Sequence, residues 1–265
     1  MTDIQTLWIE PKEKDEVRLA LDLVTGAKRP ARLWFFVHGL NSTRRGDKAQ
    51  YIAEHIIERG ETFASLDLTG HGESDGDLRG LTLSRNIRDL SRGLDFAKQR
   101  SGPYSAVYLI GSSMGGITGA WYSARSPGVV RANILIAPAF EMAGRLLLAL
   151  GPKKSQRFRS EREIHLDTEY ASFDLDYGFV EDESRYPVSE LVERLQTPTL
   201  IVHGSNDESV PCQLSRRFAA KSQVVKFVEV DGGDHRLTNH KELIVEEMIE
   251  FVNGLDREAK VEHLH

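Results

Sequence analysis

Residues 107–121 have the sequence VYLIGSSMGGITGAW, which is the strongest indication of the fold. The apolar run before Gly111 predicts a buried strand, and the small residues after Ser113 predict a helix that packs closely on it. Between strand and helix lies Gly111-Ser112-Ser113-Met114-Gly115, which fits the pattern G-x-S-x-G. In that pattern a tight turn pushes the serine hydroxyl out over the edge of the sheet. We therefore expect Ser113 to be a nucleophile.

The same short pattern occurs a second time, as GESDG at residues 72–76. Ser74 lies in a polar run from Gly70 to Gly80, with no strand before it and no helix after it. Because the motif has meaning only in a strand–turn–helix context, we expect Ser74 to be a turn serine.

Strand-like and helix-like segments alternate on both sides of the motif. Apolar runs predict strands at residues 33–37, 62–68, 106–110, 130–136, 199–202 and 224–230, and an alternating pattern predicts a half-buried strand at 17–24. Apolar stripes predict helices at 47–59, 82–99, 114–125 and 237–255. This order predicts an α/β fold with a mostly parallel, doubly wound sheet, and antiparallel pairing only at its N-terminal edge.

One segment interrupts the alternation. Residues 140–196 contain no convincing core strand, and a structureless loop of that length is unusual in a compact domain. We expect an inserted cap at 140–196, built of short helices and turns, on a core formed by residues 1–139 and 197–258. Residues 259–265 are expected to be a C-terminal tail.

A serine hydroxyl needs a base, and the base is usually a histidine held by a carboxylate. Asp207 follows the strand predicted at 199–202, and His235 follows the strand predicted at 224–230. Both therefore lie at strand carboxyl ends, where open parallel sheets bind their ligands. The order Ser113, Asp207, His235 predicts a catalytic triad.

Other residues compete for these roles. Glu208 is the alternative acid, whereas Asp234 is too near His235 in sequence to reach its far ring nitrogen easily. His203 is expected at a strand end, in the core or paired with the backbone. His71, in a loop, and His240, on the last helix, are expected to be structural or exposed.

An acyl-transfer site also needs donors for the oxyanion. The backbone N–H of Met114, directly after the nucleophile, is one candidate. The loop His38-Gly39-Leu40 after the early buried strand supplies the other, through the N–H of Leu40. The alternative for His38-Gly39 is a plain strand-ending turn.

Composition limits the remaining possibilities. The chain has a net charge of -6 and one cysteine, which gives nucleic-acid binding no electrostatic support and allows no internal disulfide. No His/Cys cluster has metal-ligand spacing, so neither metal nor cofactor is expected. No apolar run approaches the ~20 residues of a membrane span, and no signal peptide is recognisable, so we expect a cytoplasmic protein.

Five segments together resemble the α/β-hydrolase superfamily: residues 38–40, 67–74 (DLTGHGES), 111–116, 203–207 (HGSND) and 233–235 (GDH). Within it, feruloyl- and cinnamoyl-esterase-like enzymes and the acyl-protein-thioesterase-like branch are most similar. The resemblance implies hydrolysis of small-molecule carboxylic esters or thioesters through an acyl-enzyme. Peptidase, lactonase and perhydrolase chemistry share these residues. A degenerate binding module would have lost one of the three triad residues, and none is lost.

The substrate pocket is expected over Ser113. His38 and Gly39 are its candidate core residues, and the cap aromatics Tyr170, Phe173 and Tyr177, with Phe179, could line its other side. The alternative is that these aromatics form the cap's own small core.

Overall fold

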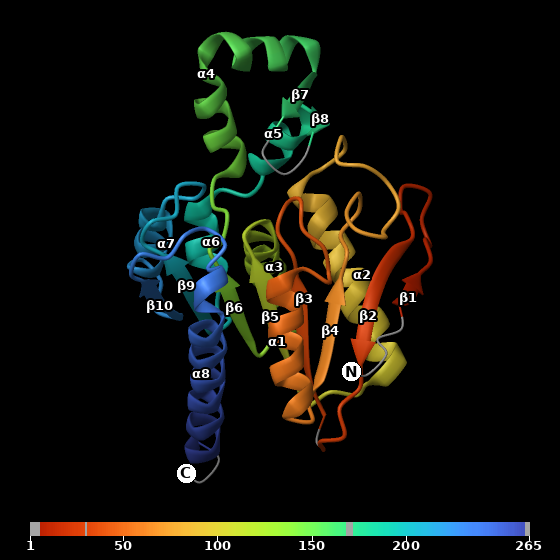
Figure 1. Ribbon diagram of the computed structural model, residues 1–265, viewed down its shortest axis with the longest axis vertical. Coiled ribbons are helices and arrows are strands. Elements are labelled where there is room, and N and C mark those ends of the chain that lie inside the picture. The colour runs from red at the N-terminus through yellow and green to blue at the C-terminus, as the bar shows by residue number, and fades with distance from the viewer. Residues whose placement is uncertain (1–5, 30, 168–171, 263–265) are drawn as a thin grey trace.

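The computed structural model describes residues 6–29, 31–167 and 172–262, and it places them in an α/β core with a cap above it (Figure 1). The main sheet has the strand order β1-β2-β4-β3-β5-β6-β9-β10. Its strands are β1 Thr6–Ile9, β2 Leu19–Val24, β3 Arg32–Val37, β4 Thr62–Leu66, β5 Ala106–Ser112, β6 Ala132–Ile136, β9 Thr199–Gly204 and β10 Val225–Val230. The core helices are α1 Asp47–Glu58, α2 Leu83–Ser101, α3 Met114–Arg125, α7 Cys212–Ala219 and α8 Lys241–Glu262, with the short 3-10 helix η1 Thr238–His240.

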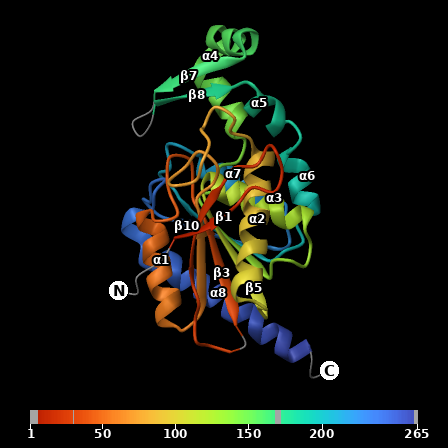
Figure 2. The same ribbon diagram turned by 90° about the vertical axis from the view of Figure 1, so that its right-hand side faces the viewer.

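The apolar strands are buried because helices cover both faces of the sheet (Figure 2). Along β3, Phe35 and Val37 pack in the cluster that includes α2, whereas Trp34 and Phe36 pack in the cluster that includes α1 and α8. Successive side chains of a strand point to opposite faces, so a continuous apolar run is what a two-sided burial requires. The α/β prediction is confirmed.

The pairing follows the predicted directions. β3, β4, β5, β6, β9 and β10 are parallel, and antiparallel pairs occur where β2 joins β1 and β4 at the N-terminal edge. The edge strand β1 was not predicted, because four residues give too short an alternation to recognise. Ser74 joins its loop to β2 in this region, because its Oγ accepts a hydrogen bond from the N–H of Ala20 at 2.9 Å.

Between β6 and β9 the chain leaves the core to form the cap, which stands above the sheet in Figure 1. It contains α4 Met142–Glu161, a two-stranded antiparallel sheet of β7 Glu163–Asp167 and β8 Ser172–Asp176, α5 Gly178–Glu183 and α6 Val188–Arg194. The cap thus differs from the expected short helices and turns. Helix α4 is long but kinked at Gly151, which has a φ of 73° and is followed by Pro152.

The end of the chain also differs from expectation. Helix α8 runs to Glu262, so most of the segment expected to be a tail continues the helix. Its apolar stripe ends near Leu255, which is why the sequence pattern gave the earlier boundary. Within the described residues, no helix is long and apolar enough to cross a membrane.

Candidate active site

Ser113 lies at the turn between β5 and α3, in a conformation that few residues adopt. Its φ of 53° and ψ of −114° hold it in the left-handed half of the backbone map, at a typical cost of about 1–3 kcal/mol. The end of β6 and the loop after it hold the turn, because the N–H of Ser113 donates to the carbonyl of Ile136 at 2.8 Å and the N–H of Ala139 donates to the carbonyl of Ser113 at 3.0 Å. Gly39 approaches so closely that a Cβ there would lie 3.0 Å from the Cβ of Ser113.

The structure brings the three predicted triad residues together at the carboxyl ends of β5, β9 and β10. His235 Nε2 lies 3.0 Å from Ser113 Oγ, and His235 Nδ1 lies 2.6 Å from Asp207 Oδ2. Because the carboxylate accepts, Nδ1 carries the proton and Nε2 is free to accept from the serine hydroxyl. This hydrogen-bonded chain can move a proton from Ser113 to His235.

A second histidine, His203, shares the carboxylate of Asp207. Its Nε2 lies 2.9 Å from Asp207 Oδ2 and 3.0 Å from the carbonyl oxygen of Val210. Both partners accept, so Nε2 is protonated, and the hydroxyl of Ser215 donates to Nδ1 at 2.7 Å. His203 is fully buried. Its bond to a side-chain carboxylate was not predicted.

The charge of Asp207 is strongly favoured at this position. Burial alone raises the pKa of the carboxyl group, but hydrogen bonds from His203, His235 and the N–H of Val210 outweigh it and hold the pKa well below its ordinary value. The second oxygen accepts from the N–H groups of Ser209 at 2.9 Å and Val210 at 2.7 Å. The alternative acid, Glu208, is exposed and takes no part in this network.

The two expected oxyanion donors flank Ser113. Among the described residues, no acceptor binds the N–H of Leu40 or that of Met114. The carbonyl of Gly39, which belongs to the same peptide unit as the Leu40 N–H, accepts from His38 Nδ1 at 2.8 Å and from the N–H of Ser42 at 3.2 Å. Since the C=O and N–H of a trans peptide point in opposite directions, these bonds turn the Leu40 N–H away from them.

His38 is therefore a support of the loop. It is fully buried, and the N–H of Leu68 donates to its Nε2 at 3.1 Å, which fixes the proton on Nδ1. Burial, with the charge of His71 adding to it, lowers the pKa of His38 to about 3. The ring stays neutral at all ordinary pH values, so this hydrogen-bond pattern does not change near neutrality.

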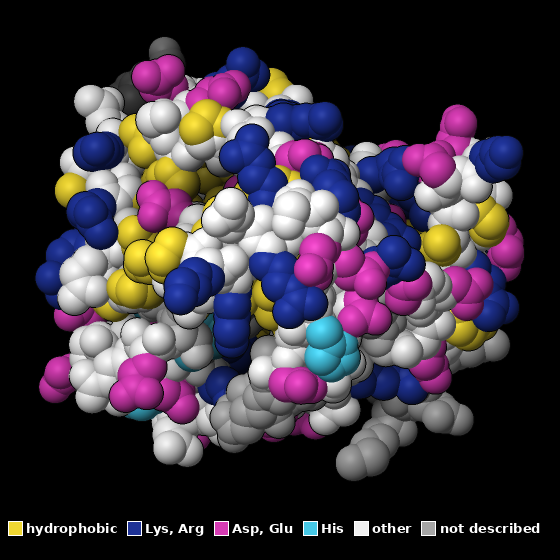
Figure 3. Space-filling view, turned by 90° about the horizontal axis from the view of Figure 1, so that it is seen from above, with side chains coloured by type: hydrophobic (Ala, Val, Ile, Leu, Met, Phe, Trp, Pro, Cys, Tyr) yellow, Lys and Arg dark blue, Asp and Glu magenta, His cyan; other side chains and the backbone are white. Residues whose placement is uncertain are grey.

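A cavity of about 1070 Å³ opens over Ser113 between core and cap. Figure 3 shows this side of the molecule, where apolar side chains lie among Lys and Arg side chains. Phe173 and Phe179 line the cavity with other apolar cap residues, namely Met142, Leu146, Ala149, Leu166 and Leu175. Tyr177 packs edge-on against Phe158 instead, with ring centroids 5.0 Å apart, and is not a lining residue. Tyr170 lies outside the described residues.

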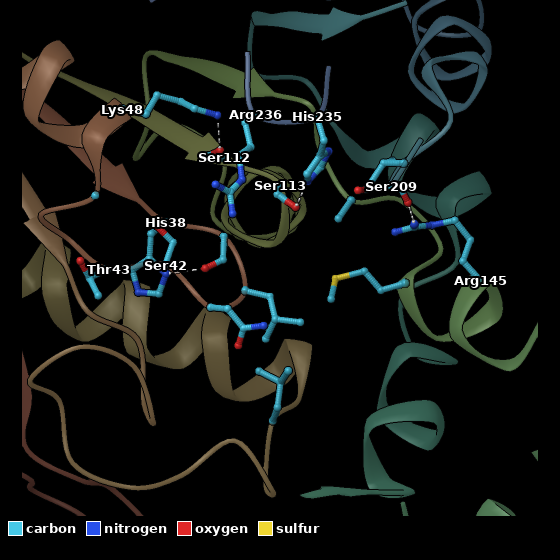
Figure 4. A pocket seen from close by; sticks show the side chains of 18 of the residues that line it. His38, Ser42, Thr43, Lys48, Ser112, Ser113, Arg145, Ser209, His235 and Arg236 are labelled. Atoms are coloured by element: carbon cyan, nitrogen blue, oxygen red, sulfur yellow. Dashed lines mark hydrogen bonds between the residues drawn. The ribbon is translucent and has the colours of Figure 1, made fainter. Parts of the chain in front are cut away.

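The four basic residues described in the cavity lining, Lys48, Arg145, Arg236 and Lys241, were not predicted. Figure 4 shows Lys48 reaching toward Ser112, Arg236 extending beside Ser113, and Arg145 near Ser209 on the other side. Lys48 lies on α1 and meets Ser112, 64 positions away in the chain, so no local pattern could place it. The position of Arg236 next to His235 was the one available sequence signal.

The sequence of the chain matches one protein family and is similar to several known proteins. A family model described as serine aminopeptidase, S33 matches residues 28–174, which include Ser113 and end before Asp207 and His235. The palmitoyl-protein thioesterase ABHD10 of Mus musculus, named as mitochondrial, is 28% identical over 207 residues, covering 76% of this chain and 68% of that protein. A monoglyceride lipase homolog of Monkeypox virus is 24% identical over 236 residues, covering 80% and 84%.

Solved structures show the same fold. The mouse α/β hydrolase domain-containing protein 10 superposes with a TM-score of 0.79 at 24% identity, covering 95% of this chain and 99% of that one. Est1E from Butyrivibrio proteoclasticus with ferulic acid bound gives a TM-score of 0.78 at 25% identity, covering 93% and 99%. These similarities, with the family match, place the chain among hydrolase enzymes with the α/β-hydrolase fold.

Proposed function

Because the chain belongs to the serine aminopeptidase S33 family of α/β hydrolases, we propose that it is a serine hydrolase that cleaves carboxylic esters through an acyl-enzyme on Ser113. The observation that carries the proposal is the hydrogen-bonded chain from Ser113 Oγ through His235 to Asp207, at 3.0 Å and 2.6 Å. These groups stand in the order that activates a serine.

In the acylation step, Ser113 Oγ attacks the acyl carbon while its proton moves to Nε2 of His235. The carbonyl electron pair moves onto the oxygen, which the N–H groups of Leu40 and Met114 hold. The tetrahedral intermediate then collapses, the bond to the leaving group breaks, and His235 gives its proton to the departing oxygen. Asp207 stabilises the imidazolium throughout.

Deacylation repeats these steps with water. Water gives a proton to His235 and bonds to the acyl carbon, the bond to Ser113 Oγ breaks, and the proton returns to Ser113. One water is consumed, and a carboxylic acid and an alcohol are released. The unusual backbone of Ser113 and the neutral His38 beneath Gly39 keep this geometry fixed through both halves.

Thioester hydrolysis is the second candidate, favoured by the similarity to the mouse palmitoyl-protein thioesterase. The apolar cap side of the cavity suits an acyl chain in either case. The predicted cytoplasmic location stays a prediction; the mouse relative is named as mitochondrial.

Peptide cleavage from a free amino terminus is less compatible with the charges. Such a substrate carries an ammonium group, which carboxylates bind. Among the described lining residues, the acidic side chains are Asp47, which pairs with Lys241 at 2.8 Å, and the exposed Glu208, whereas Lys48, Arg145 and Arg236 add positive charge. The similarity to Est1E with ferulic acid bound also favours esters.

A substrate panel combined with active-site labelling tests the proposal. The panel holds p-nitrophenyl esters, acyl thioesters and aminoacyl p-nitroanilides, and a fluorophosphonate probe reports the nucleophile. We expect turnover of esters or thioesters, slower or no turnover of anilides, and probe attachment to Ser113. Failure of the probe to label Ser113 in a folded protein that also turns over no ester would contradict the proposal.

A further inference from the structure

The charges that line the cavity are unbalanced. Among the described residues that line it, four side chains are cationic and two are acidic. One of the acids, Asp47, is already neutralised by Lys241, because the two form an ion pair at 2.8 Å. Arg145 donates to the carbonyl oxygens of Phe140 and Ser209, and these neutral partners leave its positive charge in place. The described lining residues therefore carry more positive than negative charge.

In the described part of the chain, no acidic side chain is in contact with Lys48. Its ammonium donates to Ser112 Oγ at 3.0 Å, and no carboxylate of the described chain lies within ion-pair distance of it. Burial lowers the pKa of Lys48 to about 8, against the pull of Asp234 and Asp207. The residue also lies in the first turn of α1, where the helix dipole disfavours a cation. Its position is costly to the fold unless an anion compensates it.

Arg236 adds to the same positive region. It directly follows His235, and its charge acts on Lys48 and disfavours the protonated form there. Figure 4 shows both side chains on the same side of Ser113, away from Arg145. Two cations that repel one another beside a nucleophile form a site that an anionic group relieves.

We propose that Lys48 and Arg236 form a subsite for an anionic group carried by the leaving group of the ester. The inference rests on the proposed function, since His235 must give its proton to the leaving atom. The leaving group then lies along the loop that carries His235 and Arg236, next to Lys48. The acyl chain takes the apolar side formed by the cap residues, which include Phe173 and Leu146.

Two butyrate esters test the subsite directly. Their alcohols are 4-hydroxybenzoate, which carries a carboxylate, and 4-hydroxybenzamide, its neutral analogue of similar shape. Each kcat/KM is divided by the rate of hydrolysis by hydroxide, so that leaving-group reactivity cancels. We expect the wild-type protein to prefer the carboxylate ester by about tenfold or more, the usual value of one charge-assisted hydrogen bond.

Charge variants show which residue causes the preference for the carboxylate ester. Lys48→Met should lower it several-fold, and Lys48→Arg should retain most of it. Lys226→Met removes a positive charge from β10, outside the cavity, and controls for net charge. If the Lys48→Met protein fails to fold, Arg236→Gln replaces it in the same comparison. A wild-type preference below twofold, or a preference that persists in Lys48→Met, would overturn the subsite.

The same experiment distinguishes failure of the subsite from failure of the proposed function. Turnover of the neutral ester that is lost in Ser113→Ala supports the serine mechanism whatever the charge preference. An enzyme that hydrolyses both esters equally would therefore keep the proposed function and lose the subsite. If neither ester is hydrolysed, binding of 4-hydroxybenzoate against 4-hydroxybenzamide is measured by calorimetry, and equal affinities would overturn the subsite.

Discussion

Replacing Lys48 by Met should make the protein more stable while it damages the anion subsite. The pKa of Lys48 falls from the ordinary 10.5 to about 8, chiefly because burial disfavours the ammonium. Each pKa unit corresponds to about 1.4 kcal/mol, so holding the charge at pH 7 costs the fold about 3 kcal/mol. The variant also loses the hydrogen bond to Ser112, worth about 1 kcal/mol.

The net gain expected for Lys48→Met is about 2 kcal/mol in the free energy of unfolding at pH 7. For a chain of this size that corresponds to a rise of about 5 °C in Tm. The destabilisation by the wild-type lysine is fully present below pH 8 and fades as pH rises toward 10.5, where the unfolded chain also loses the proton. The difference in Tm between variant and wild type should shrink over the same range.

Thermal unfolding followed by circular dichroism at pH 7 and at pH 10 measures both effects. Lys226→Met is the matched control, because it removes an exposed lysine that pairs with Glu247 and should change Tm by less than about 2 °C. A Lys48→Met protein with an unchanged or lower Tm at pH 7 would show instead that the Lys48 ammonium does not destabilise the fold.

Three further predictions concern the site and the cap. Asp207→Asn should lower kcat by about 10³–10⁴-fold with little change in KM, measured with a p-nitrophenyl ester, because the amide cannot favour the imidazolium; a loss below tenfold would contradict its role. His38→Phe removes the donor that holds the Gly39 carbonyl. It should lower kcat by about 10²-fold, as the loss of an oxyanion donor does, and an unchanged kcat would contradict the supporting role of His38. Phe173→Ala should shift the acyl-chain preference, because Phe173 lines the cavity. Tyr177→Ala should instead lower the free energy of unfolding by about 2–4 kcal/mol and leave the acyl-chain preference unchanged, because Tyr177 packs on Phe158. The reverse pattern would exchange the roles of the two residues.

The core was predictable because its signals are local. The apolar run before Gly111 and the small residues after Ser113 fix a strand, a turn and a helix within one short stretch. Asp207 and His235 follow strands in the same way, and the parallel topology alone brings strand carboxyl ends to one edge. The approach of three distant segments thus follows from the order of the strands.

The cap and the basic subsite were less predictable, for two different physical reasons. The strands β7 and β8 are short and half exposed, so the alternation in Glu163–Asp167 is weak and was missed. The direction of Tyr177, which packs on Phe158, depends on a turn that the pattern does not define. The contact of Lys48 with Ser112 depends on how α1 docks on the sheet, which is a tertiary property.

In the proposed mechanism, the acyl group passes through Ser113 Oγ. Rapid-quench mass spectrometry with p-nitrophenyl butyrate tests it most directly, by searching the peptide that contains Ser113 for one added butyryl group. We predict that this adduct forms in the wild-type protein within a single turnover and that Ser113→Ala forms neither adduct nor product. Ester turnover at an undiminished rate in folded Ser113→Ala protein, without an adduct, would exclude Ser113 as the nucleophile.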